Sequence, residues 1–230
     1  MEEIGAAAGR AIGLLATDPA VREIAARTLG VSGAATALCV LTGVPAGYVM
    51  ARRRFPGRTV LLALANTGMG LPPVLVGLVV WLLLVRSGPL GGLEIVYTKR
   101  AMVLAQFLIG LPIVIGFATS TFQALPPELD DLIAMLGMGR VRRIALLARE
   151  ARLGLLAAVM AAFGGVVSEV GASMMVGGNL RGSTRVLTTA IVTEASRGES
   201  ERALALGAIL LVLALALNLV LTRIQQAGRA

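Results

Sequence analysis

Five long apolar stretches constrain this chain more than any other feature of its sequence. Four of them hold 20 to 27 residues without a charged side chain, and the fifth, residues 153–180, carries only Glu169. A helix needs about 20 apolar residues to cross the hydrocarbon core of a bilayer. Inside that core, a helix satisfies its own backbone polar groups. We therefore expect an all-α integral membrane protein with about five transmembrane helices, near residues 28–51, 59–85, 101–125, 153–172 and 203–222.

The composition of the chain excludes a soluble domain. Hydrophobic residues make up 57% of its 230 residues, and the mean hydropathy is +0.84. A soluble domain of this size must cover its surface with polar groups and rarely reaches such values. More than half of the 28 glycines lie within the apolar runs, where small residues let helices approach closely in lipid.

Several kinds of chemistry are excluded by the residues that the sequence lacks. It contains no histidine and one cysteine, Cys39, so it offers neither a His-based triad nor a Cys or His metal site. The only lysine is Lys99, and no G-x-x-x-x-G-K followed by Ser or Thr surrounds it, so this chain has no P-loop for ATP. We expect no catalytic residue, metal or cofactor in it.

The first 27 residues differ from the five apolar runs. Apolar side chains alternate there with Arg10, Asp18, Arg22 and Glu23. This pattern is too charged to span a bilayer and predicts an interfacial helix in contact with lipid. The expected organisation is thus an N-terminal interfacial helix over 1–27 and a transmembrane domain over 28–225.

The arginines indicate how the chain is oriented in the membrane. The net charge is +8, but the cations lie in short loops between apolar runs, which argues against a nucleic-acid partner. With the N-terminus outside, segments 52–58, 128–152 and 223–230 are cytoplasmic, and their cation density is about twice that of the external segments. We expect a multi-pass protein of the cytoplasmic membrane, with its N-terminus outside and its C-terminus in the cytoplasm.

The long cytoplasmic segment 128–152 has the features of a docking site. Pro126-Pro127 closes the third run, acids follow at the start of a helix, and a short apolar face leads to a glycine turn and a basic helix. A plain connection needs neither this length nor an apolar face. We expect the contact with a partner to be made by Asp131, Leu132, Ile133, Met135, Leu136, Gly137, Met138, Gly139 and Arg140.

This segment resembles the coupling loop of type I ABC importer permeases. The family motif is Glu-Ala-Ala, three residues, Gly, nine residues, Ile and a Leu-Pro pair. Here Asp131-Leu132-Ile133 stands at the triplet and Gly137 at the glycine, whereas Arg149-Glu150 replaces the Leu-Pro pair. The match to the general motif is therefore partial.

A wider resemblance covers residues 5–225. LPPVLVGLVVWLLLVRSGPLG (71–91), AQFLIGLPIVIG (105–116) and EVGASMMVGGNLRGSTRVLTTAIVTE (169–194) look like the tungstate-type permeases of the sulfate, molybdate and tungstate group. The resemblance implies a permease for tungstate or molybdate that works with a second copy of itself. It also implies two ATP-binding cassette subunits that bind ATP-Mg, and an extracytoplasmic oxyanion-binding protein.

Polar residues after the fourth run are candidates for the translocation path or its gate. Cationic and neutral hydrogen-bond donors suit an oxyanion, although a solvated external loop has the same composition. Glu169 is either functional or a helix-end residue paired with Arg181 or Arg185. The candidates are Glu169, Asn179, Arg181, Ser183, Thr184 and Arg185.

Other functions remain as alternatives at this stage. A permease of this group for sulfate or another small solute fits the same sequence. A secondary transporter needs several buried ionisable groups for its coupling ion, and only Glu169 qualifies. An intramembrane hydrolase lacks a base, because no span contains an Asp, a His or a Ser–Lys pair.

Overall fold

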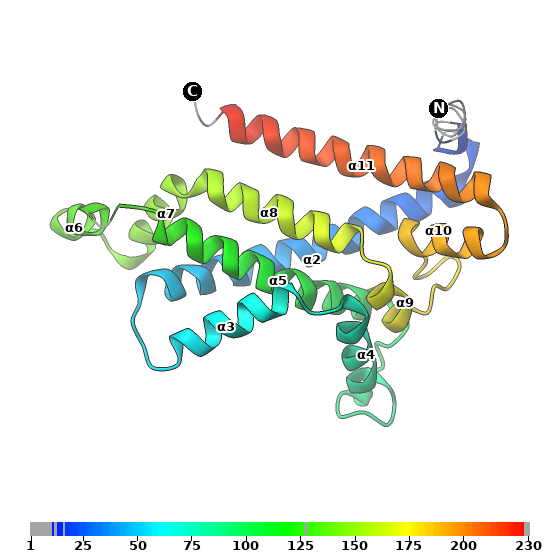
Figure 1. Cartoon of the computed structure of the whole chain (residues 1–230), viewed down its shortest axis with the longest axis horizontal. Coiled ribbons are helices and arrows are strands. Elements are labelled where there is room, and N and C mark those ends of the chain that lie inside the picture. Colours follow the sequence, from blue (N-terminus) through cyan, green and yellow to red (C-terminus); the bar gives the residue numbers. More distant parts are fainter. Residues whose placement is uncertain (1–10, 12, 16, 127, 228–230) are drawn as a thin grey trace.

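The computed structural model describes residues 11, 13–15, 17–126 and 128–227, and this part of the chain is helical and contains no strand. Figure 1 shows the arrangement of the elements. In chain order they are α2 (Pro19–Arg52), α3 (Arg58–Met69), α4 (Pro73–Leu84), the 3₁₀ turn η1 (Gly91–Leu93), α5 (Lys99–Gln123), α6 (Glu128–Met135), α7 (Arg140–Glu150), α8 (Arg152–Val167), α9 (Gly171–Gly177), α10 (Leu187–Ser196) and α11 (Ser200–Ala227).

Helix α5 is the centre of the fold, and α2, α3, α4, α8 and α9 all pack against it. Glycines bring α2 close to α5: a Cβ on Gly43 would lie 2.8 Å from Val114 Cγ1, and one on Gly47 would lie 2.6 Å from Ala118 Cβ. Side chains larger than hydrogen would push these helices apart. Helix α11 lies on the outside, against α10 and α8, and exposes large apolar side chains as a lipid-facing helix does.

The long helices gather the loops at two ends of the molecule (Figure 1). At one end lie the start of α2, α9 and α10, and Arg202 there approaches Asp18 at 3.6 Å. At the other end lie α6, α7 and the end of α11, and Arg52 Nη2 there donates to the Leu125 carbonyl at 3.4 Å. The segments predicted to be external and cytoplasmic are therefore separated into these two groups.

The predicted second span is not a single helix. Three helices, α2, α5 and α11, are each long and apolar enough to cross a membrane, whereas α3 and α4 form a pair bent by 107°. Helix α3 ends at Met69, and the prolines at 72 and 73 restart the chain in a new direction because proline donates no backbone hydrogen bond. Since Arg52 lies beside Leu125, α3, α4 and the loop after them connect the two ends of α5, with the geometry of a broken span or a re-entrant loop.

The fourth predicted span also differs. Helix α8 ends at Val167, five residues before the predicted limit, and its pair with α7 is bent by 76°. Ser168 Oγ donates to the Gly164 carbonyl at 2.8 Å at this end of the helix. Because α8 alone has only 16 residues, it is about 24 Å long, shorter than the hydrocarbon core.

The predicted interfacial segment is divided by Asp18. The Asp18 carboxylate accepts from Ala20 N at 2.9 Å and Pro19 is the first helical residue, so α2 begins there and residues 19–27 are its first turns. Among the residues before Asp18, Ala11 is buried in a cluster with Leu206 of α11. Residues 1–10, 12 and 16 lie outside the described part.

Candidate functional site

Helix α6 has one face against the protein and one face exposed. Ile133 is 1% exposed and packs in a cluster with Phe122 of α5 and Leu147 of α7. Leu132 and Met135 are exposed, Met135 to 85%, and Leu136 just after the helix is 61% exposed. The spacing of the three exposed residues places them on one side of the helix. Helix α6 therefore presents an exposed apolar surface, while Ile133 on its opposite side packs against α5 and α7.

A glycine turn joins α6 to α7. Gly137 has φ +61°, in the left-handed region that favours glycine, whereas Gly139 has φ −64° as the residue before α7. The glycine turn predicted at this position is thus present. Met138 between them is half-buried against the Ile133 cluster. Asp131 and Arg140 lie within α6 and α7, and their side chains are outside the description.

The loop after α9 begins with two left-handed residues. Gly178 has φ +66°, and a Cβ on it would lie 2.8 Å from the Tyr97 ring, so both conformation and space require glycine. Asn179 follows with φ 50° and donates through Nδ2 to Thr193 Oγ1 of α10 at 2.7 Å. These two residues turn the chain back towards α10.

Hydrogen bonds inside this loop hold its polar side chains. Thr184 is fully buried; its hydroxyl donates to the Gly177 carbonyl and accepts from Leu180 N at 2.9 Å. Arg185 is 8% exposed and donates from Nε to Asn179 Oδ1 at 3.1 Å. Of the predicted path residues, Asn179 and Arg185 are therefore bonded to each other and Thr184 is bonded to the loop backbone, whereas Arg181 and Ser183 are exposed.

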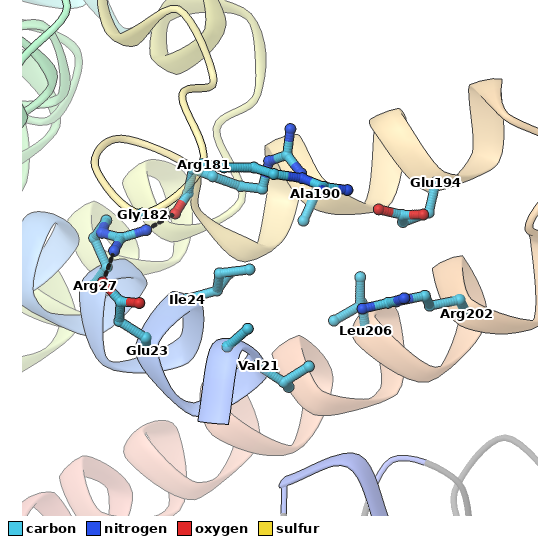
Figure 2. Close-up of a pocket in the computed structure, with 12 residues that line it drawn as sticks. Val21, Glu23, Ile24, Arg27, Arg181, Gly182, Ala190, Glu194, Arg202 and Leu206 are labelled. Carbon is cyan, nitrogen blue, oxygen red and sulfur yellow. Dashed lines mark hydrogen bonds and ion pairs between the residues drawn. The ribbon is translucent and has the colours of Figure 1, made fainter. Parts of the chain in front are cut away.

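The start of α2 fixes the same loop. Arg27 Nη1 donates to the Arg185 carbonyl at 2.8 Å, and Thr28 Oγ1 accepts from Leu187 N at 2.9 Å. Arg27 also bonds Glu23 one turn earlier (Figure 2). In the sequence, Arg27 marks only the start of the apolar run 28–51. Its distance of 158 residues from Arg185 left no sequence signal for this contact.

A pocket of about 260 Å³ lies between this loop, α2, α10 and α11 (Figure 2). Four arginines from three parts of the chain line it, and one of them, Arg202, was also missed by the sequence analysis. Burial and the neighbouring cations Arg181 and Arg197 lower the pKa of the Arg185 guanidinium. The lining residues are Ala20, Val21, Glu23, Ile24, Arg27, Arg181, Gly182, Arg185, Ala190, Glu194, Arg202 and Leu206.

Glu169 lies between α8 and α9 and is 8% exposed. Its Oε1 accepts from Ala172 N in the first turn of α9 at 2.8 Å, and its carbonyl accepts from Thr188 Oγ1 at 3.0 Å. Arg185, one of its expected partners, instead bonds Asn179. The carboxylate therefore caps a helix at the end of the fourth span. No group of three potential metal ligands occurs among the described residues.

Comparison with known proteins identifies the class of this helical membrane protein. Residues 43–228 match the family model of the binding-protein-dependent transport system inner membrane component, and the chain belongs to this family. It is a multi-pass membrane protein and the permease subunit of an importer.

Two relatives cover most of the chain. It is 46% identical over 202 residues to a probable anion ABC transporter permease protein of Haloferax volcanii. The aligned residues cover 85% of this chain and 87% of the relative. The chain is 36% identical over 213 residues to the tungstate uptake system permease protein TupB of Peptoclostridium acidaminophilum, with 93% of each covered.

A solved structure shares the fold. A chain of the inward-facing MetNI methionine ABC transporter superposes with a TM-score of 0.72, over 90% of this chain and 95% of that one. The sequence identity is 17%, so the likeness concerns the fold alone.

Proposed function

We propose that this permease imports a tetrahedral oxyanion: first the group 6 oxyanion tungstate, ahead of molybdate, with sulfate third. The observation that carries the proposal is the similarity over nearly the whole chain to a tungstate uptake permease and to a probable anion permease. The donor-rich loop 177–189 supports it, because its arginine, amide and hydroxyl groups suit an oxyanion. Arginine recognises the charge and the oxygens of such an ion rather than its central atom.

The proposed transporter contains two copies of this chain, with two ATP-binding cassette subunits that bind ATP-Mg and an extracytoplasmic oxyanion-binding protein. The exposed residues Leu132, Met135 and Leu136 support a contact with an ATPase subunit, because a soluble loop rarely exposes such a cluster without a partner. We assign the other predicted loop residues, including Asp131 and Arg140, to the same contact. The hydrolysis of ATP then resides in the partner, not in this chain.

The proposed orientation places α6 and α7 in the cytoplasm and the loop after α9 outside. The transmembrane domain extends over 28–225, and the N-terminus is external. The cation density of the segments at the α6 end supports this orientation. Glu169, Asn179, Arg181, Ser183, Thr184 and Arg185 then lie on the external side, where the binding protein delivers its anion.

The proposed mechanism is alternating access driven from α6. Closure of the ATPase subunits on ATP displaces α6, and Ile133 transmits the displacement because it is packed between α5 and α7. Since α5 contacts five other helices, the packed core moves as a rigid body rather than deforming locally. The residues of this chain guide the ion and form no bond with it, because an ion held too tightly does not leave.

Uptake into proteoliposomes tests the proposal. The vesicles contain this permease and its ATPase, with the cognate binding protein added on the external face. We expect saturable, ATP-dependent tungstate uptake that sulfate competes for poorly; vesicles without ATP or without the binding protein are the controls. Uptake of an organic solute or a cation, with no oxyanion uptake, would overturn the substrate and leave the permease class intact.

A further inference from the structure

We propose that the pocket lined by Arg27, Arg181, Arg185 and Arg202 binds one phosphate-type oxyanion, either a free tetrahedral anion or the phosphodiester of an anionic lipid headgroup. The chemistry of this pocket does not depend on which substrate the permease transports. Its volume of about 260 Å³ is below the usual range of about 300–1,000 Å³ for larger organic ligands. A small, highly charged group fits it better than an organic solute.

The charges of the pocket leave two arginines without a carboxylate. Arg27 pairs with Glu23, and Arg202 approaches Asp18 at 3.6 Å. Glu194, the other acid of the lining, is paired with Arg197 at 3.5 Å, and its charge acts on Arg185 without a direct ion pair. In the described part of the chain, no ion pair with Arg181 or Arg185 is present. Two guanidinium groups are therefore left to neutralise a dianion or a phosphodiester.

In the part of the chain that the structure describes, one buried donor of the pocket lacks an acceptor, and Arg185 donates only to neutral groups. Arg27 is 6% exposed, and its Nε has no hydrogen-bond partner among the described residues. Arg185 is 8% exposed and donates only to the neutral side chain and carbonyl of Asn179. Burying a cation without an opposite charge is costly. A bound oxyanion removes this cost because each oxygen accepts from several guanidinium donors.

The pocket is placed so that an anion can reach it from two sources, which the experiment has to distinguish. Arg27 is the last charge before the apolar run of α2, and Arg202 is the last before that of α11, so the pocket lies at the boundary between membrane and water. Val21, Ile24 and Leu206 form an apolar wall beside the arginines. A lipid phosphate is available at this depth, and so is a small anion arriving from the solution.

Equilibrium binding to the assembled transporter, permease with its ATPase, tests the site. In nanodiscs of zwitterionic lipid, radiolabelled inorganic phosphate and sulfate are titrated at constant ionic strength. In a second arm, phosphatidylglycerol retained by the transporter is quantified by mass spectrometry. The test variant combines Arg181→Gln and Arg202→Gln, whose side chains are exposed enough that folding is retained. The control, Arg86→Gln, removes the charge of an exposed arginine outside the pocket.

We expect wild type and the Arg86→Gln control to bind the anion with the same affinity. The double variant should bind it at least tenfold more weakly, because hydrogen bonds to charged groups are strong. Free anion bound in zwitterionic discs supports a site for soluble oxyanions. Phosphatidylglycerol retained in the second arm, with no free anion bound, supports a headgroup site. Equal binding by wild type and the double variant, or no binding in either arm, overturns the proposal. Tungstate uptake by wild type is measured separately, so a failed transport proposal is recognised independently.

Discussion

Replacing Gly137 with valine isolates the conformation of the turn that holds α6. Gly137 has φ +61° and Gly139 has φ −64°, and a Cβ at either position meets nothing within 4 Å. Space is therefore equal at the two sites, and only the backbone differs. Gly139→Val is the matched control, because its φ and ψ of −64° and 158° lie in the region that valine favours.

The expected cost is comparable with the energy that anchors α6. A left-handed conformation costs a residue with a Cβ about 1–2 kcal/mol, and valine, being β-branched, is among the least tolerant. Burial of one large apolar side chain, as for Ile133, contributes about 1.5–3 kcal/mol. The strain at position 137 thus offsets much of the burial energy of Ile133 that holds α6 in place. A penalty of about 1.4 kcal/mol lowers the ratio of correctly placed to displaced α6 about tenfold.

The assay is ATP hydrolysis by the reconstituted transporter, stimulated by the loaded binding protein, together with uptake. For Gly137→Val we expect several-fold lower stimulation and uptake with normal membrane insertion, because α6 no longer meets the ATPase in one orientation. Gly139→Val should lose clearly less than Gly137→Val, because the backbone conformation of Gly139 suits valine. Unchanged stimulation in Gly137→Val, or an equal loss in both variants, would refute the role of the left-handed turn.

Two further predictions concern topology and helix capping. Single cysteines at Ser87 and Gly139, in a Cys39→Ala background, should react with impermeant reagent from opposite sides of the membrane; reaction of both from one side would contradict the proposed five crossings. Glu169→Ala should destabilise the permease by about 1–2 kcal/mol through loss of the cap on Ala172 N, seen as a lower thermal unfolding midpoint in detergent. Glu169→Gln keeps an acceptor oxygen and should retain most stability and uptake; normal stability without uptake would show that the charge itself is required.

The presence of long apolar spans was predictable because lipid imposes a strong local rule, whereas their number was not: three helices are long and apolar enough to cross a membrane, or up to five if each bent pair is one span. Any run of about 20 uncharged residues has to be helical in the hydrocarbon core. The runs 28–51 and 203–222 accordingly lie within α2 and α11, and the run 101–125 lies within α5 up to Gln123. The limits of the helices were less predictable. Helix α2 starts at Pro19, nine residues before the apolar run, because the helix begins at the Asp18 cap and not where the charged residues end.

Part of the candidate site was predictable because it depends on residues that are close together in the sequence. The α6 face and the Gly137 turn depend on neighbours in sequence, so their pattern is visible in the chain itself. The bonds within the 177–189 loop are also short-range, and its residues were singled out together. The pocket required Arg27 and Arg202, which lie far from Arg185 in the chain and mark only the ends of apolar runs in the sequence.

The sequence alone determined a helical membrane protein with apolar spans and separate polar ends, because the transfer of each segment between water and lipid depends on the local composition. Only the tertiary structure decided the 107° break between α3 and α4 and the meeting of Arg27 with the Arg185 carbonyl. Both depend on packing around α5. Within lipid, helix association is governed by close contact and hydrogen bonds between particular side chains, and those partners are distant in sequence.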